Sequence, residues 1–165
     1  MPGHQRVTNF RFLAQPTDVN FGGKVHGGMV MKWIDQAGYA GAVGWSGQYC
    51  VTVAVGGIQF VRPILIGDLV TVRCTLIHTG TSSMHFGIDV LARDLKTQVE
   101  RLATHCVIVF VALDAPDGKP IPVPPWLPQT EDDRRMAEYA QKMQELSRQQ
   151  EEAVKNFVPI LRTDG

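Results

Sequence analysis

A single acidic side chain lies in a stretch of sequence that is otherwise almost free of charge. Asp35 falls within the apolar stretch from Gly27 to Trp45, in which Lys32 is the only other charged residue. An ionised carboxylate inside an apolar layer is strongly unfavourable unless it is paired or hydrogen-bonded, and such a placement is typical of catalytic groups. Lys32 could instead form an ion pair with Asp35, so the stretch alone leaves both interpretations open.

A glycine-rich segment leads into this stretch. Gly22, Gly23, Gly27 and Gly28 fall within the nine residues that begin at Asn20, which indicates unusual backbone angles or a close approach to a ligand. Free N–H groups at the start of a helix favour an oxyanion or a phosphate. The spacing matches neither the dinucleotide-binding G-x-G-x-x-G nor the phosphate-binding G-x-x-x-x-G-K-[ST], and a flexible turn remains an alternative.

The other reactive side chains form no site by their spacing. His105 and Cys106 are adjacent in a strand-like segment, so their side chains point to opposite faces and cannot form a nucleophile–base pair. His78 and His85 flank a turn without further ligand-type residues, and we expect no metal site there.

Composition excludes several classes of protein. The 165 residues are 44% hydrophobic and 19% charged with zero formal net charge, which is typical of a globular protein and predicts neither nucleic acid nor membrane as a partner. No apolar run reaches membrane-spanning length, and the first residues do not resemble a signal peptide. Cys50, Cys74 and Cys106 are far apart and lie among apolar residues, so we expect buried thiols and a cytoplasmic location.

The elements that must position these residues follow an α+β order. The apolar stretch predicts a helix over His26–Trp45 that is buried on all sides, and its many glycines favour close approach of a sheet or a second helix. Alternation and β-branched residues predict five strands, over Val7–Leu13, Val51–Val61, Leu69–Thr79, Ser83–Arg93 and Glu100–Leu113. Short turns leave no room for crossover helices, so we expect an antiparallel sheet.

A proline-rich connector divides the chain. Six prolines fall between Asp114 and Pro128, and residues 130 to 155 hold 12 of the 32 charged residues. We therefore expect a body over residues 1–128 and a C-terminal amphipathic helix and tail over residues 129–165. Thr130 is the expected N-cap, and an apolar stripe predicts docking on the body or on a neighbouring subunit, with a solvated, partly frayed helix as the alternative. The stripe consists of Met136, Tyr139, Met143, Leu146, Ala153 and Phe157.

Several spaced motifs together resemble one known family. The segment N-F-G-G-K-V-H-G-G-M-V-M-K-W-I-D, from Asn20 to Asp35, is similar to the N-x-x-G-x-x-x-G-G-x-x-x-x-x-x-D signature of hotdog-fold acyl-CoA thioesterases. The most similar branch contains the bacterial cytosolic acyl-CoA thioesterases and the brain-type acyl-CoA hydrolases. The resemblance covers roughly residues 7 to 125. It continues through Val51–Val55, Phe60, Pro63, Gly67-Asp68, Gly80–Met84 and Val109–Pro124.

The resemblance implies a fold, an assembly and an activity. In that family a long central helix is wrapped by an antiparallel sheet of five or six strands, and two domains pair so that the active sites lie at their interface. The residues matching Asn20 and Asp35 come from opposite subunits, and the branch commonly assembles into trimers of dimers. The implied reaction is hydrolysis of acyl-CoA to a fatty acid and CoA, without a cofactor because CoA is part of the substrate.

The resemblance also implies roles for individual residues. Asp35 would act as general base or as nucleophile, and Asn20 would orient the water. The backbone N–H groups of Gly27 and Gly28 would polarise the thioester carbonyl, and His26 could assist or only cap the helix. Substrate contacts are implied for a further set: Thr52, Thr81, Ser82 and Ser83. Two departures stand out: many relatives carry Arg or Lys where Thr81 stands, and Gly56-Gly57 replaces a bulkier, often acidic pair.

Two other functions remain open at this stage. A hotdog hydratase or dehydratase would need His26 beside the carboxylate. A non-catalytic acyl-CoA-binding protein would normally carry a fused regulatory domain. Acyl chain length and the choice between tetramer and hexamer do not follow from the residues.

Overall fold

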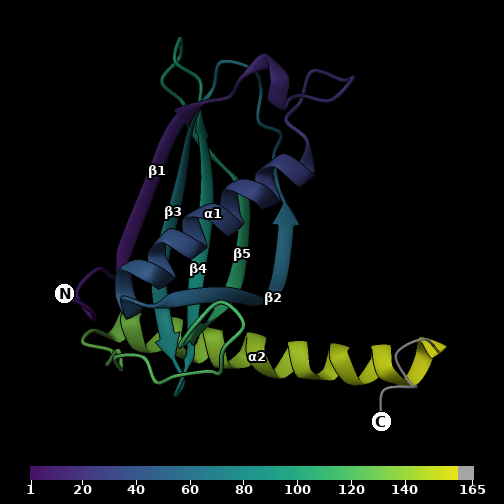
Figure 1. Ribbon diagram of the computed structural model, residues 1–165. Coiled ribbons are helices and arrows are strands. Elements are labelled where there is room, and N and C mark those ends of the chain that lie inside the picture. Colours follow the sequence, from purple (N-terminus) through teal and green to yellow (C-terminus); the bar gives the residue numbers. More distant parts are fainter. Residues whose placement is uncertain (160–165) are drawn as a thin grey trace.

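The computed structural model describes residues 1–159 as a five-stranded sheet with one helix on each face (Figure 1). All strand pairs are antiparallel, in the order β1-β3-β4-β5-β2. The bounds are β1 Val7–Leu13, β2 Tyr49–Phe60, β3 Leu69–Thr79, β4 Ser83–Arg93 and β5 Glu100–Leu113. Four strands have the predicted bounds, and β2 begins two residues earlier than predicted and ends one residue earlier. The outer edges of the sheet are therefore β1 and β2.

Helix α1 (Gly27–Ser46) crosses one face of the sheet at very short range. A Cβ atom placed on Gly38 would lie 2.6 Å from Phe110 Cε2, and one placed on Gly41 would lie 2.9 Å from Cys74 Sγ. Glycine at these two positions therefore lets the helix backbone rest directly on β5 and β3, as the glycine content of the stretch predicts. Gly47, with a φ of 68°, ends the helix in a left-handed C-cap.

The opposite side of α1 is not covered in the single chain. Asp35, Gln36, Met31 and Tyr39 are exposed, whereas Ile34 and its neighbours toward the sheet are buried. The prediction of a helix buried on all sides is thus wrong for one chain. The physical reason is that a single curved sheet can cover only one side of the helix, and the apolar residues on the other side remain open.

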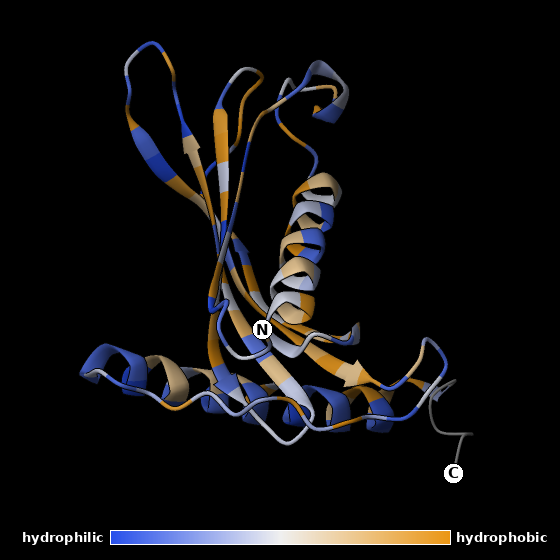
Figure 2. Cartoon of the chain, turned by 60° about the vertical axis from the view of Figure 1, so that its left-hand side comes forward, coloured by the Kyte–Doolittle hydropathy of each residue, from blue (hydrophilic) through white to orange (hydrophobic). Residues whose placement is uncertain are grey.

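Helix α2 (Glu131–Phe157) crosses the other face of the sheet. Thr130 is the N-cap, as predicted, and its hydroxyl accepts a hydrogen bond from Asp133 N at 3.1 Å. Arg6 holds the start of the helix through an ion pair with Asp133 at 2.8 Å. The predicted apolar stripe docks in its first half only: Met136, Tyr139 and Met143 pack with buried Ile77, Val107 and Ala140. Figure 2 shows the hydrophilic surface of α2 against largely hydrophobic strands.

The proline-rich connector links β5 to α2 as an extended segment. Ile121 N donates to Ala112 O at 2.9 Å, and Val123 N donates to Thr81 O at 2.9 Å. Of the tail predicted over residues 129–165, residues 160–165 lie outside the described part. Among the helices of residues 1–159, none is long and apolar enough to cross a membrane.

Candidate active site

Asp35 lies on the exposed side of α1, where β2 supplies its hydrogen-bonding partner. The Thr52 hydroxyl donates to Asp35 Oδ1 at 2.6 Å, across the edge between the helix and the sheet. Among the described residues Lys32 forms no ion pair with this carboxylate, so the alternative of a Lys32–Asp35 pair is wrong. The expectation of an Asp35 buried in an apolar layer is also wrong for the single chain. One hydrogen bond holds the carboxylate, and the side chain is otherwise exposed.

The loop before α1 is organised by the side chain of Asn20. Its Oδ1 accepts hydrogen bonds from Gly22 N at 2.9 Å and Lys24 N at 3.2 Å. Gly23 has a φ of 77°, a backbone conformation that requires glycine here. The Nδ2 group of Asn20 makes no hydrogen bond within residues 1–159, so it is free to donate to a water or a substrate.

A pocket of about 310 Å³ joins this loop to the first turn of α1. Its wall includes Asn20 and Gly27, and its charged side chains are the cations Lys24 and Arg62. Helix hydrogen bonding begins with Val30 N, which donates to His26 O at 3.1 Å, so the N–H groups at the start of the helix are available to a ligand. The pocket can therefore take an anionic or strongly polar group. The full lining is Asn20, Lys24, Val25, Gly27, Val30, Phe60, Val61, Arg62, Pro63, Ile64 and Thr104.

His26 and Gly28 complete the first turn. His26 is the N-cap residue, its backbone N–H donates to Asp18 O at 2.9 Å, and its exposed side chain makes no capping hydrogen bond. Nothing lies within 4 Å of the position that a Cβ atom would take on Gly28. Both residues therefore face open space at the start of the helix.

Within one chain, Asp35 does not share this pocket. Asp35 lies eight positions after Gly27 in the helix, which is about 12 Å along the axis. The structure therefore places the predicted catalytic residues in two groups. Asn20, Gly27 and Gly28 lie at the start of α1, and Asp35 with Thr52 lies at its middle beside β2.

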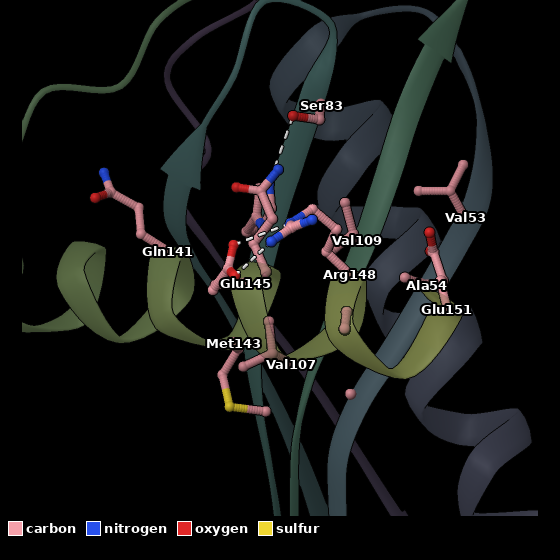
Figure 3. A pocket seen from close by; sticks show the side chains of 14 residues that line it. Val53, Ala54, Ser83, Val107, Val109, Gln141, Met143, Glu145, Arg148 and Glu151 are labelled. Atoms are coloured by element: carbon pink, nitrogen blue, oxygen red, sulfur yellow. Dashed lines mark hydrogen bonds and ion pairs between the residues drawn. The ribbon is translucent and has the colours of Figure 1, made fainter. Parts of the chain in front are cut away.

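The predicted substrate-contacting turn lies in another part of the molecule. Thr81 and Ser82 form the turn between β3 and β4, where Ser82 O accepts from Ala112 N at 3.1 Å. Ser83 Oγ lies 3.4 Å from His85 Nε2. Ser83 and His85 line a larger pocket of about 470 Å³ on the α2 face of the sheet (Figure 3). A single chain does not bring this turn and Asp35 together.

A hydrogen-bonded network that sequence reasoning missed joins α2 to the sheet. His105 Nδ1 lies 2.8 Å from Asp89 Oδ1, and His105 Nε2 lies 2.9 Å from the Tyr139 hydroxyl. Burial raises the pKa of Tyr139, so its hydroxyl stays protonated. Only the pairing of Asp89 with His105 across β4 and β5 could have indicated this network. It links α2 to β4 and β5, in addition to the Arg6–Asp133 ion pair at the start of the helix.

His85, where the sequence predicts no metal site, is buried in the structure. It is 1% exposed, and its Nδ1 has no hydrogen-bonding partner among the described residues. Burial, and then the nearby His78, lower the pKa of His85 to about 4. Within residues 1–159, no group of three or more His, Cys, Asp or Glu side chains is arranged to hold a metal ion.

Comparison with known proteins identifies the family. Residues 22–99 match the model of the thioesterase superfamily. The chain is 35% identical over 117 residues to the acyl-CoA thioester hydrolase YciA of Salmonella typhimurium, covering 69% of this chain and 87% of that protein. It is 33% identical over 135 residues to protein VdlD of Helicobacter pylori, covering 82% of this chain and 76% of that protein.

Solved structures agree with the sequence comparisons. A hexameric acyl-CoA thioesterase in its apo form superimposes with a TM-score of 0.84 at 29% identity, covering 91% of this chain and 96% of that chain. The chain therefore belongs to the thioesterase superfamily, among the hotdog-fold acyl-CoA thioester hydrolases, and it is an enzyme of that class. The family resemblance and the predicted α+β hotdog fold with an added C-terminal helix are confirmed.

Proposed function

We propose that this enzyme hydrolyses the thioester bond of acyl-CoA to a free fatty acid and CoA. The observation that carries the proposal is the Asp35 carboxylate, held at 2.6 Å by the Thr52 hydroxyl and otherwise open. Asp35 takes a proton from water that attacks the carbonyl carbon, or attacks that carbon directly. The carbonyl oxygen then carries negative charge, and the N–H groups of Gly27 and Gly28 stabilise it. Collapse of the intermediate breaks the C–S bond and expels the CoA thiolate. In the first route the thiolate receives the proton that Asp35 took from water, and in the second route water hydrolyses the acyl–Asp35 anhydride and frees the fatty acid.

The complete site is proposed to form between two copies of the chain. Asn20 and Gly27 lie at the start of α1, about 12 Å along the axis from Asp35, so one thioester cannot contact both groups within a chain. The edge strand β2 carries exposed Val53 and Val55 beside Thr52. Antiparallel pairing of β2 with its copy would cover these apolar side chains. It would place Asp35 of one subunit opposite Asn20 of the other.

The wider assembly and the remaining substrate contacts belong to the same proposal. The solved relative with the TM-score of 0.84 is hexameric, which favours a trimer of dimers here. Lys24 and Arg62 in the pocket at the start of α1 suit a substrate that carries phosphates. His26, Thr81, Ser82 and Ser83 are proposed substrate contacts. No cofactor is assigned, and three buried free thiols favour a cytoplasmic location.

Replacement of the carboxylate tests the activity directly. Asp35→Asn should lower the rate of thiol release from acyl-CoA by on the order of a hundredfold or more, with unchanged secondary structure and oligomer size. Asp114→Asn is the matched control, because Asp114 is an exposed carboxylate in the connector after β5. Near wild-type turnover in a folded, assembled Asp35→Asn protein would show that Asp35 is not the catalytic carboxylate.

Mixing inactive subunits tests the shared site. Asn20→Ala and Asp35→Ala proteins, each inactive alone, should regain partial activity after subunit exchange because a mixed dimer contains one site with both residues intact. If exchange is verified with tagged subunits and activity stays absent at every ratio, Asn20 and Asp35 act from the same chain.

A further inference from the structure

The C-terminal half of α2 extends beyond the edge of its own sheet. Along the helix, Tyr139 contacts β5 through His105, and Met143 and Ser147 lie over Gly57 and Gly56 of the edge strand β2. The helix continues for the ten residues from Arg148 to Phe157, which is about 15 Å at 1.5 Å per residue. All ten are exposed, and Phe157 is 81% exposed. We call residues 148–157 the arm, which Figure 1 shows reaching past β2.

A groove runs along one side of α2 on the same face of the sheet. It is the pocket of about 470 Å³ in Figure 3. Its floor is formed by Val53, Val107 and Val109, together with Ser83 and His85, and its wall is a stripe of α2 side chains. This wall consists of Gln141, Met143, Gln144, Glu145, Ser147, Arg148 and Glu151. The groove reaches β2, so it lies beside the edge of the sheet.

The strand register shows on which side of α2 the groove lies. The helix passes over a row formed by Gly87, Val107 and Gly56, which are paired across β4, β5 and β2. The groove extends to the next row, in which Val109 pairs with His85 and with Ala54. That row is about 7 Å nearer the beginning of β2. The groove therefore lies on the side of α2 that faces Tyr49–Val53.

We propose that the arm of a second copy lies in this groove. Two copies that pair through β2 in antiparallel fashion are related by a two-fold axis normal to the sheet, so both α2 helices lie on the same face and each arm crosses onto the partner. The pairing of β2 with β5 shifts register between Thr52 and Ala54 and again between Gly56 and Gln59, and at this second shift Gly57 has a φ of 63°. The proposed axis passes through the part of β2 before the second shift, so that the partner's arm lies on the side of the groove.

The chemistry of the two surfaces matches. The arm carries the exposed apolar side chains Val154 and Phe157, and the groove offers Val53 and Val109. Arg148 is already paired with Glu145 at 2.8 Å and Glu152 at 3.1 Å within its own helix. Apolar contact is then the main attraction, and we expect docking of the arm to be insensitive to salt.

Cross-linking between different chains tests this arrangement. A Val53→Cys chain is mixed with a tagged Val154→Cys chain, subunits are exchanged, and a short bismaleimide is added at low and at high salt. The native thiols are buried. We expect a mixed covalent dimer at both salt concentrations, and much less of it when Leu127→Cys, in the exposed connector, replaces Val154→Cys. Each chain carries one added cysteine, so this product can form only between chains.

A truncated chain gives a second measurement. A protein that ends at Glu151 keeps every residue that lines the groove and lacks Val154 and Phe157, and its dimer should dissociate at a protein concentration at least tenfold higher than that of the full chain. If dimers form, but the mixed product stays at the control level and the dissociation constant is unchanged, the arm does not dock and the proposal is overturned. The proposal rests on the proposed dimer. Restored activity in mixed Asn20→Ala and Asp35→Ala subunits without these two effects would therefore overturn only the docking of the arm, whereas a chain that stays monomeric would overturn both.

Discussion

The close contact between α1 and the sheet can be tested at Gly38. A Cβ atom at this position would lie 2.6 Å from Phe110 Cε2 and 3.1 Å from Ile108 Cγ2. Phe110 is 1% exposed, and its ring packs against Phe86 and Tyr39 with centroids 6.3 and 6.5 Å away. The ring therefore has no free space to enter, and Gly38→Ala must push α1 away from β5.

The magnitude follows from two opposing effects. Alanine is favoured over glycine inside a helix by about 1 kcal/mol, whereas overpacking a closely packed core typically costs about 1–3 kcal/mol. Since the clash is with a buried ring, we expect the upper end of that range and a net loss of about 2 kcal/mol. For a chain of this length the melting temperature should fall by about 4–8 °C. Asp35 lies one turn before Gly38, so thioester hydrolysis should fall as well.

Gly44→Ala is the matched control in the same helix. A Cβ atom there would meet only the exposed side chain of Gln5, at 2.7 Å from its Oε1. Gln5 can move away and lose only its hydrogen bond to Thr8 Oγ1, so the variant should be within about 0.5 kcal/mol of the parent or slightly more stable. Thermal and urea unfolding at equal protein concentration measure both variants. A Gly38→Ala protein as stable as Gly44→Ala would refute the close-packing argument.

Three further outcomes are expected. Residues 1–128 are the proposed catalytic domain. Removal of the residues after Pro128 should lower the unfolding free energy by on the order of 3 kcal/mol, because the contacts of α2 with the sheet are lost. An unchanged melting curve would contradict docking of α2. The pKa of His85 is about 4 in the folded chain, below the value of about 6.5 for an unfolded chain. The unfolded chain therefore binds a proton more readily than the folded chain. The unfolding free energy should fall as the pH is lowered from about 6.5 toward about 4. The unfolding free energy of His85→Gln, measured with urea, should depend less on pH between about 6.5 and about 4 than that of the parent. An equal pH dependence in the two proteins would contradict the lowered pKa of His85. The three cysteines are buried, and burial raises the pKa of each thiol, that of Cys106 to about 12. A thiol reagent should therefore modify Cys50, Cys74 and Cys106 only after the protein unfolds. Rapid labelling of the native protein would contradict this expectation.

Local patterns were enough to predict most of the fold. β-Branched residues and alternation gave the correct bounds for four of the five strands. The glycines of α1 predicted a close approach, although the partner of Gly38, the Phe110 ring, is known only from the structure. Thr130 and the acidic residues after it located the start of α2 to the residue, since capping depends on neighbours in sequence.

The errors and omissions involve contacts between distant parts of the chain. An apolar helix with one carboxylate indicates burial, but it does not say whether the cover comes from the same chain, and Asp35 proved exposed. The network of Asp89, His105 and Tyr139 joins β4, β5 and α2. It depends on the strand register and on the docking of α2, and neither is encoded in a local pattern.

The uneven cover of α1 explains why the proposed catalytic groups are divided along it. A carboxylate on the side toward the sheet would have been buried among residues such as Ile34 and Phe110, which offer no hydrogen-bond donor. On the open side, Asp35 finds the Thr52 hydroxyl at the edge of β2. The start of the same helix offers free N–H groups and the cations of its pocket. Each chain thus presents hydrogen-bond donors at the start of α1 and the Asp35 carboxylate at its middle, at a fixed separation along one helix. Two antiparallel copies are the simplest arrangement in which the end of one helix faces the middle of the other, and in the proposed dimer symmetry would create two identical sites.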